Sequence, residues 1–402
     1  MRLAVVIAEY DPFHKGHAAL LQAVRAAGAT HAAVVMSGSF LQRGAAACFS
    51  KWSRTRQALC CGADLVAELP LPWAATGAET FARGGVALAD ALGADMLAFG
   101  SECGSAEQLS GVAALLLRPQ LGEELRGRMK AGVPFAQARE AAVAALAGNK
   151  TAALLRGPNN ILGIEYCKAI QQQGCGMSVF TVQRRGAGHG SLEENALPSA
   201  GRVRALLCCG DKSWVQALPP AGAAIAAAEV QAGQAPASLQ NVERAVLYRL
   251  RTMSRQEYAA LPDLSEGLEN RLYAAARTAC SLEAFYRMVK TRRYSLARLR
   301  RITLSAFLGL RAGDSTGLPP YLRVLGFGPN GREILGRAAQ KGKLPLVTHT
   351  SDRQKLDSRG QSVLELENRA ADIWALCCPA PCPAGLDLTT GILFPKKGEC
   401  CT

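Results

Sequence analysis

Residues 9–17 read Glu9-Tyr10-Asp11-Pro12-Phe13-His14-Lys15-Gly16-His17 and follow directly on an apolar run at Leu3–Ala8. The run predicts a buried first strand, and the glycine after it predicts a tight entry into a helix. The first turn of a helix offers unpaired backbone N–H groups and the positive end of its dipole to an anion. His14 and His17 can therefore face one phosphate and donate hydrogen bonds to the charge that develops when its phosphorus is attacked. We predict that both histidines are catalytic.

The first half of the chain alternates between short apolar runs and helical patterns. The runs predict strands at Leu3–Ala8, Ala32–Met36, Leu65–Leu69, Met96–Phe99 and Ser178–Val182. Between them, helices are predicted at His17–Ala27, Ser53–Cys61, Glu79–Leu92, Ala106–Leu117, Phe135–Ala147 and Ile161–Gln172. This alternation predicts an α/β fold with a doubly wound parallel sheet, whose ligands bind at the carboxyl ends of the strands.

Composition divides the chain into four predicted parts. Residues 1–210 form the catalytic α/β domain, and residues 211–238, rich in Ala, Gly and Pro, form a linker region or a weakly specified helix. Residues 239–316 form a basic helical domain. Residues 317–402 form a small mixed segment with a strand-like run at Leu344–Thr348, and their last 25 residues, rich in Pro, Gly and Cys, predict a flexible tail.

The charge balance favours a polyanionic partner. Among the 402 residues, 46 are basic and 32 acidic, a net charge of +14, and nucleic acid is the leading candidate for such an imbalance. The chain has neither a run of about 18 apolar residues nor a signal-peptide pattern, so we expect a cytoplasmic protein with no membrane partner. The 14 cysteines include four adjacent pairs but no C-x-x-C spacing, which favours reduced thiols and predicts no metal site.

Several polar loops follow the predicted strands. Arg43 and Lys51 are the cations nearest the proposed phosphate site, and each is either a phosphate contact or a solvated loop charge. Asn159 and Asn160 precede a predicted helix, so an asparagine there either caps the helix or reaches a bound base. Ser199 to Arg204 open another helix and place hydroxyl and guanidinium groups at a second anion-binding end.

These motifs together resemble a known family. The H-x-G-H motif after the first strand, with a late helix start containing Ser199-Ala200 and Arg204, resembles the nucleotidyltransferase superfamily, which has a Rossmann-like fold. Longer stretches resemble the bacterial tRNA(Met) cytidine acetate ligase family, densely over residues 1–205 and more thinly beyond. They are Val6–His17, Val35–Gly44, Lys51–Arg54, Gly62–Pro70, Phe99–Glu102 and Pro158–Gly163.

The resemblance implies an activity and a set of nucleotide contacts. It implies activation of acetate by ATP as acetyl-adenylate, release of pyrophosphate, and acetylation of N4 of the wobble cytidine of elongator tRNA(Met), which gives N4-acetylcytidine. Carried over by position, the ATP contacts are Ile7, Ala8, Glu9, Tyr10, Asp11, Pro12, Phe13, His14, Lys15, Gly16, His17, Ala18, Ala19, Leu20, Gly100, Asn159, Asn160 and Arg185. The choice between Asn159 and Asn160 stays open, with the spacing favouring Asn160. Mg²⁺ is a candidate assistant, although no carboxylate cluster of the type that binds it stands out.

The helical part carries the strongest sign of RNA binding. Seven cations and no acid lie within residues 287–301, with Tyr286 and Tyr294 beside them: Arg287, Lys290, Arg292, Arg293, Arg298, Arg300 and Arg301. A merely solvated helix face normally carries both signs of charge, so this stretch predicts contact with an RNA backbone. The flexible Gly188-His189-Gly190 loop is a second candidate, for contact with the acceptor base. We expect tRNA as the partner and no DNA.

Two other functions stay open at this point. A plain nucleotidyltransferase acting on a phosphorylated small molecule shares the H-x-G-H motif but does not need the basic helical domain. A non-catalytic RNA-binding protein on the same scaffold would need neither histidine. Exchange of pyrophosphate into ATP separates the three functions, because it requires acetate in the ligase, a phosphorylated metabolite in the second case, and does not occur in the third.

Overall fold

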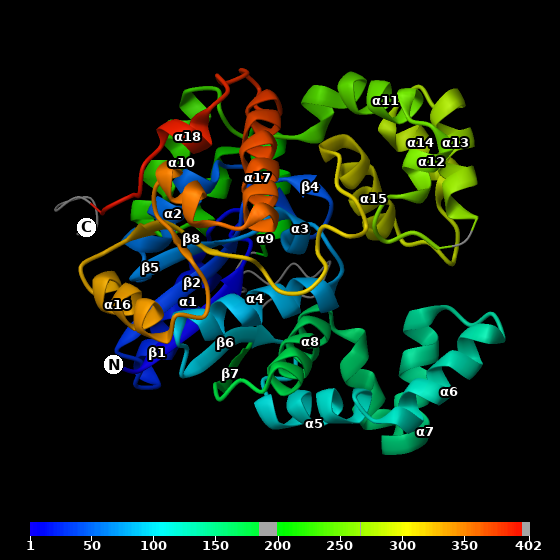
Figure 1. Ribbon diagram of the computed structural model, residues 1–402, viewed down its shortest axis with the longest axis horizontal. Coiled ribbons are helices and arrows are strands. Elements are labelled where there is room, and N and C mark those ends of the chain that lie inside the picture. The colour runs from blue at the N-terminus through cyan, green and yellow to red at the C-terminus, as the bar shows by residue number, and fades with distance from the viewer. Residues whose placement is uncertain (185–198, 266, 396–402) are drawn as a thin grey trace.

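The computed structural model describes residues 1–184, 199–265 and 267–395, and its centre is a seven-stranded sheet (Figure 1). The strands of this sheet are β1 (Leu3–Ala8), β2 (His31–Ser37), β5 (Leu65–Leu69), β6 (Met96–Ser101), β7 (Ser178–Gln183), β8 (Leu322–Phe327) and β9 (Leu346–Val347). Their order is β7-β6-β1-β2-β5-β8-β9. Each of the five strands expected in the first half is present. The predicted α/β class is confirmed.

The strands from the first half pair in parallel, as expected. In the β1–β2 pair, Leu3 lies opposite His31 and Ala8 opposite Met36, so the carboxyl ends of the two strands meet at the same edge. β6 joins β1 on the other side, and β7 extends the sheet beyond β6. β8 departs from this pattern because it runs antiparallel to β5. A small separate hairpin, β3 (Phe40–Leu41) and β4 (Ala45–Ala46), follows β2.

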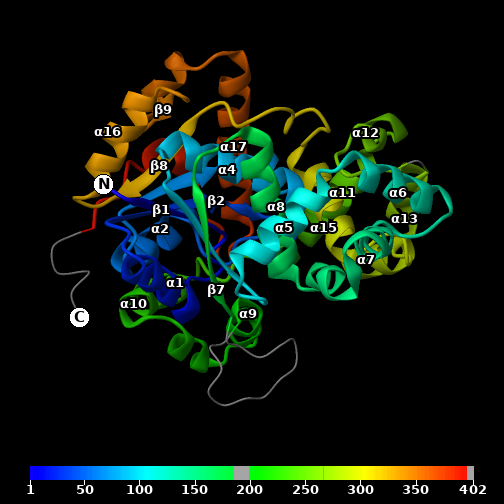
Figure 2. The same cartoon turned by 90° about the horizontal axis from the view of Figure 1, so that it is seen from below.

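Helices cover both faces of the sheet. The helices of the first half are α1 (Lys15–Ala26), α2 (Lys51–Cys60), α3 (Leu71–Ala74), α4 (Ala78–Leu92), α5 (Ala106–Leu116), α6 (Pro119–Lys130), α7 (Phe135–Ala153) and α8 (Pro158–Gln173). Alternate residues of β1 enter different cores. Val5 packs on the α4 and α8 side, whereas Val6 packs on the α1 and α2 side. Figure 2 shows α4 on one face of the sheet and α1 on the other.

The second half of the chain adds a helical domain and completes the sheet. Its helices are α9 (Ala200–Cys208), α10 (Pro220–Gln231), α11 (Glu243–Thr252), α12 (Arg255–Ala259), α13 (Leu268–Thr278), α14 (Leu282–Val289), α15 (Leu296–Leu308), α16 (Gly331–Lys341), α17 (Ser358–Leu376) and α18 (Leu386–Thr389). Helices α11 to α15 share a core of their own around Leu250, Leu272 and Phe285. They lie to one side of the sheet in both views (Figures 1 and 2).

Segments that composition marks as linker and tail pack against the α/β domain. Helix α10, within the predicted linker, lies against α2, where Gly222 brings its backbone close to Gln57. Residues 386–393 of the predicted flexible tail are folded, and Leu393 bridges to Gly326 of β8. The boundaries of the four parts stay a prediction.

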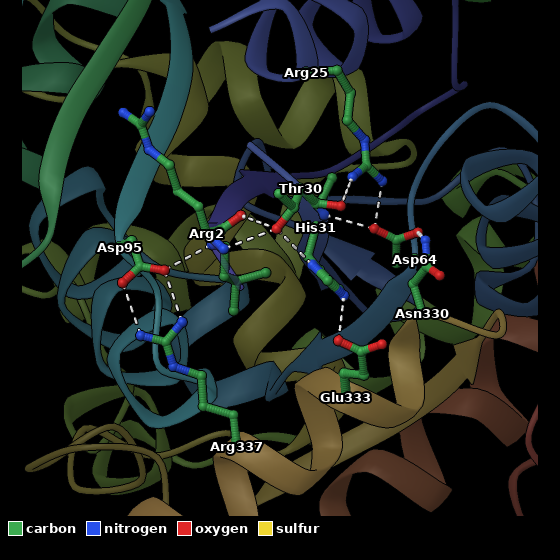
Figure 3. A network of polar contacts seen from close by, with 11 residues as sticks. Arg2, Arg25, Thr30, His31, Asp64, Asp95, Asn330, Glu333 and Arg337 are labelled. Atoms are coloured by element: carbon green, nitrogen blue, oxygen red, sulfur yellow. Dashed lines mark hydrogen bonds and ion pairs between the residues drawn. The ribbon is translucent and has the colours of Figure 1, made fainter. Parts of the chain in front are cut away.

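The amino-terminal edge of the sheet is held by a polar network (Figure 3). His31 lies between Thr30 and Glu333, with its Nε2 3.2 Å from a Glu333 oxygen. Asp95 accepts two hydrogen bonds from Arg337, at 2.7 and 2.8 Å. This network ties α16 to β1 and β2 at the edge opposite to the one that carries the H-x-G-H motif.

Candidate active site

Two histidines cap the first helix at the carboxyl end of β1. His14 is the N-cap of α1, with extended backbone, and its Nδ1 accepts a hydrogen bond from the N–H of Gly16 at 3.0 Å. In return, Nδ1 of His17 accepts from the N–H of His14 at 3.2 Å. The pair forms a capping box in which both side chains are imidazoles. A Cβ at Gly16 would lie 2.8 Å from the His14 ring, so only glycine leaves room for this arrangement.

The capping bonds fix which nitrogen of each ring carries the proton. Because both Nδ1 atoms accept from the backbone, both neutral rings must carry hydrogen on Nε2. The rings stack with centroids 3.8 Å apart and planes 21° apart. The structure therefore brings the two predicted catalytic histidines together as adjacent Nε2–H donors at a helix start.

Both histidines are held in the neutral form. Burial, followed by the nearby Arg184 and Arg204 guanidiniums, lowers the pKa of His14 to about 4. Burial also lowers the pKa of His17 well below its usual range, with His14 and Arg184 adding to the effect. Neutral imidazoles bind an anion as hydrogen-bond donors, while the two arginines supply the positive charge.

The neutral His14 predicts an acid-dependent loss of stability. The unfolded pKa is near 6.5 and the folded pKa about 4, so between these pH values the unfolded chain binds more protons. The free energy of unfolding should therefore fall by about 3 kcal/mol as the pH drops from 6.5 to 4, and this contribution should not change further below pH 4. NMR titration of the His14 Cε1 proton measures the folded pKa directly. A midpoint near 6.5 would contradict the assignment.

The carboxylate of Asp11 anchors the loop between β1 and α1. Its carboxylate pairs with Arg43 and accepts from the backbone N–H of Cys48 at 2.6 Å. Arg204 of α9 donates to the Asp11 carbonyl at 2.7 Å. Burial opposes ionisation of Asp11, but Arg43 and Arg204, helped by Arg54, lower its pKa overall. Arg204 thus belongs to the site, as the predicted second anion-binding helix start suggested.

The loop after β6 meets the start of α8 beside this motif. A Cβ at Gly100 of β6 would lie 3.2 Å from Cγ of Arg184. The absence of a side chain at Gly100 therefore leaves room for the Arg184 side chain to lie against β6. Asn160 is buried, and its Oδ1 accepts from the backbone N–H groups of Glu102 and Cys103 at 3.0 and 3.1 Å. Asn159 donates to Glu102 at 2.8 Å. Neither asparagine is the N-cap, because Gly157 holds that position.

The remaining predicted ATP contacts divide by exposure. Tyr10 and Phe13 are core side chains, 1% and 0% exposed, and the Ile7 side chain is also buried. These three residues can therefore offer backbone groups but not side chains to a ligand. Lys15 and Ala19 are exposed on α1. Arg185 and the Gly188-His189-Gly190 loop lie outside the described residues.

Lys51 is neither a phosphate contact nor a solvated charge, so both alternatives that we left open for it are wrong. It is 2% exposed, and its Nζ lies 2.8 Å from Glu68 and 2.7 Å from Asp387. Arg323 of β8 joins the same two carboxylates, at 3.2 and 2.7 Å. We call these four residues the buried charge cluster. Sequence could not reveal it, because Lys51 and Asp387 are 336 residues apart.

Arg54 holds the carboxyl ends of the first two strands, a role that sequence reasoning missed. It is fully buried and donates to the carbonyls of Glu9 at 2.7 Å, Ser37 at 2.9 Å and Gly38. Buried backbone carbonyls at a strand end need such donors. The only sequence signal was the Lys51–Arg54 stretch of the family resemblance.

The basic stretch of the helical domain lies on α14, α15 and the turn between them. Arg287, Lys290, Arg292, Arg293 and Arg300 are exposed. Arg298 donates to the Asp263 carbonyl at 2.8 Å, and Arg301 pairs with the Asp263 carboxylate at 2.9 Å. Five of the seven cations are thus exposed. The other two, Arg298 and Arg301, are partly buried and hold α15 against the loop at Asp263.

Helix α15 lies directly against the catalytic domain. Gly44, in the turn between β3 and β4, has a φ of +74°, and a Cβ there would lie 2.4 Å from the backbone carbon of Arg300. Only glycine combines that backbone conformation with so close an approach. Arg43, the preceding residue, pairs with Asp11. The β3–β4 turn therefore links Arg300 of the basic helix to Asp11 in the loop that carries the histidines.

The described residues offer neither a metal-binding cluster nor a membrane-spanning helix. They contain no group of three or more His, Cys, Asp or Glu side chains arranged to hold a metal ion. Within the same residues, no helix has the length and apolar character needed to cross a membrane.

Comparisons with known proteins agree over nearly the whole chain. A family model described as HIGH Nucleotidyl Transferase matches residues 1–385. The tRNA(Met) cytidine acetate ligase of Alkaliphilus metalliredigens is 35% identical over 401 residues, 94% of each chain. That of Syntrophotalea carbinolica is 37% identical over 402 residues, covering 94% of this chain and 95% of its own. The crystal structure of Thermotoga maritima TmcAL bound with alpha-thio ATP matches with a TM-score of 0.90 at 30% identity, covering 98% of this chain and 100% of that one.

Proposed function

This chain belongs to the tRNA(Met) cytidine acetate ligase family, within the HIGH nucleotidyltransferases, and on that premise we propose that it acetylates N4 of the wobble cytidine of elongator tRNA(Met). The substrates are ATP, acetate and the tRNA, and the reaction takes place in the cytoplasm on RNA rather than DNA. Similarity that extends through the basic helical domain carries the proposal, because a plain nucleotidyltransferase does not need that domain.

The first step of the proposed reaction is adenylation of acetate. A carboxylate oxygen of acetate attacks the α-phosphorus of ATP, and pyrophosphate leaves with the electron pair of the broken P–O bond. His14 and His17 donate through Nε2 to the α-phosphate oxygens, on which negative charge accumulates in the transition state. Arg184 and Arg204 lie close enough to His14 to lower its pKa, and their charge favours a bound triphosphate.

The nucleotide contacts that we propose for this step include those carried over from the family. They are the segment Ile7 to Leu20, Gly100, one of Asn159 and Asn160, and Arg185. Within the segment, the start of α1 presents the positive end of its helix dipole to the phosphates. The half-buried Asn159 is the more accessible asparagine, since the Oδ1 of Asn160 already serves two backbone donors. Mg²⁺ would shield the departing pyrophosphate.

The proposed activity is tested with purified protein, ATP, acetate and tRNA(Met) transcript. Digestion of the product and mass measurement of its nucleosides should show N4-acetylcytidine only when all three substrates are present. Pyrophosphate exchange into ATP should require acetate. Exchange that requires a phosphorylated metabolite instead, or no exchange at all, would overturn the proposal.

We expect the exposed arginines of the turn before α15 to bind the tRNA backbone. Changing Arg292 and Arg293 to Glu should raise the Kd for tRNA by about 10- to 100-fold near 0.1 M salt and reduce the salt dependence by about two released counterions. Filter binding at several salt concentrations measures both effects. Changing Arg332 and Lys341 of α16 to Glu alters the charge equally on the far side of the sheet and is the matched control. Equal losses in the two variants would contradict a local RNA surface.

A further inference from the structure

The second step of the proposed reaction requires a proton acceptor. When N4 of cytidine attacks the acetyl carbon of acetyl-adenylate, the nitrogen must lose one proton as the amide forms. Amines of this kind are poor nucleophiles, so a base placed beside N4 would accelerate the step by roughly 10²- to 10⁴-fold. If the chain has the proposed function, one of its side chains must provide that base.

The two histidines are already committed as donors. Their Nδ1 atoms accept the backbone N–H groups of Gly16 and His14, which leaves Nε2–H as the outward-facing group of each ring. A ring in this state cannot accept a proton without breaking the cap of α1. The base must therefore be another side chain.

Asp11 and Glu102, two described carboxylates near the histidines, are held by hydrogen bonds. The oxygens of Asp11 accept from the Cys48 N–H and pair with Arg43, and its side chain is 1% exposed. The oxygens of Glu102 accept from the backbone N–H groups of Asn159 and Asn160 at 3.0 and 2.6 Å. Asp11 is therefore shielded from a substrate proton. Glu102 is partly exposed, but burial, which raises its pKa, is outweighed by the hydrogen bonds from Asn159 and Asn160, so its lowered pKa makes it a weaker base than an ordinary glutamate.

Glu9 differs from both. Its Oε1 accepts from the backbone N–H of Gln42 at 2.8 Å. Among the described residues, the partner of its Oε2 is Arg43, whose guanidinium nitrogen forms an ion pair at 3.6 Å, beyond an ordinary hydrogen bond. The side chain is 28% exposed. Arg54 fixes the Glu9 carbonyl at 2.7 Å, so the residue is well anchored while one carboxylate oxygen stays available.

Glu9 also lies where nucleotide and RNA must meet. It begins the loop that carries His14 and His17, and it holds the Gln42 end of the β3–β4 turn. The other end of that turn, Gly44, packs against the backbone of Arg300 in the basic helix. A tRNA bound on α15 would bring its acceptor base toward this turn.

We propose that Oε2 of Glu9 accepts the N4 proton during acetyl transfer. The N4–C bond forms, the bond between the acetyl carbon and the phosphate oxygen breaks, and AMP leaves with that electron pair. The proton passes to Glu9 and then to water, which restores the carboxylate. No further reactant is needed.

The surroundings of Glu9 strengthen it as a base. Burial raises its pKa above the usual value, and Asp11 adds to that effect, whereas Arg43, the Gln42 N–H and Arg204 oppose it. Burial, and then the charge of Glu9, raise the pKa of Tyr166 of α8. A carboxylate with a raised pKa binds the N4 proton more strongly than an ordinary glutamate would.

The test separates the two half-reactions in the full-length enzyme with tRNA(Met). Glu9→Gln keeps an oxygen that can accept from Gln42, so the turn should hold its place. Single-turnover transfer from preformed acetyl-adenylate to tRNA should slow by about 100-fold more than acetate-dependent pyrophosphate exchange does. The wild-type transfer rate should fall on the acid side with the titration of one group. That acid limb should be absent in Glu9→Gln and restored in Glu9→Asp.

Two outcomes would overturn the proposal. Equal losses of exchange and transfer in Glu9→Gln would mean that Glu9 only positions the loop, and an unchanged acid limb would mean that another group is the base. Failure of the wild-type enzyme to form N4-acetylcytidine would instead refute the proposed function. The two failures are therefore distinguishable.

Discussion

Replacing His17 with alanine is expected to reduce acetate-dependent pyrophosphate exchange by about 10²- to 10³-fold, while the Kd for tRNA changes little. Removal of one preorganised donor from a developing oxyanion typically has an effect of this size. The substitution also removes the acceptor for the His14 N–H, so the His14 ring loses part of the support that orients it. The measurement is radiolabelled pyrophosphate exchange at saturating ATP and acetate.

His31→Ala is the matched control for His17→Ala. His31 is buried to a similar degree as His14, 7% against 4% exposed, but belongs to the network with Glu333 at the opposite edge of the sheet (Figure 3). Its loss should affect stability and leave the exchange rate per folded molecule near that of the wild type. Full exchange activity in His17→Ala would refute the role of its Nε2–H, whatever the control shows.

Replacing Lys51 with methionine should have the largest effect on stability among the substitutions considered. Glu68 and Asp387 would keep only Arg323, leaving one buried negative charge without compensation. Burial and the neighbouring Glu68 already raise the pKa of Glu367 well above its usual range, so this region tolerates no further negative charge. Breaking a buried pair of this kind destabilises a protein by about 3–5 kcal/mol.

Urea unfolding of Lys51→Met measures this loss, with Lys343→Met as the control. Lys343 forms an exposed pair with Asp90, whose removal should change the free energy of unfolding by less than about 1 kcal/mol. Adding Glu68→Gln to Lys51→Met should recover part of the loss, because it removes the unpaired charge. Equal stability of wild type and Lys51→Met would show that the buried charge cluster does not stabilise the fold.

Sequence predicted the parts of the fold that local pattern determines. Runs such as Leu3–Ala8 are apolar on both faces, and only a strand buried between two layers of helices needs that pattern. β8 was not predicted because its sequence includes Arg323 and Gly326, which are unusual in a buried strand. Arg323 is accommodated there by its ion pair with Asp387, and Gly326 by its bridge to Leu393. A local sequence pattern cannot indicate contact partners that are distant in the chain.

The same distinction applies to the candidate site. His14 and His17 could be predicted because a helix start after a strand gives them their geometry locally. Lys51 was misplaced for the opposite reason, since its partners come from β5 and α18. Arg54 and Glu9 act through the ends of separate strands, so their roles became visible only when those ends were brought together.

The antiparallel β8 has a consequence for the order of folding during synthesis. Residues 1–184 contain β1, β2, β5, β6 and β7, which pair in parallel, and a nascent chain of that length could assemble them early. Until residues 322–387 follow, however, β5 remains an open edge, and Lys51 and Glu68 lack Arg323 and Asp387. Translation must therefore run almost to the end of the described chain before β8 can pair with β5. Until then, the exposed edge of β5 can pair with other chains and cause aggregation, which makes the partly synthesised domain a natural substrate for chaperones.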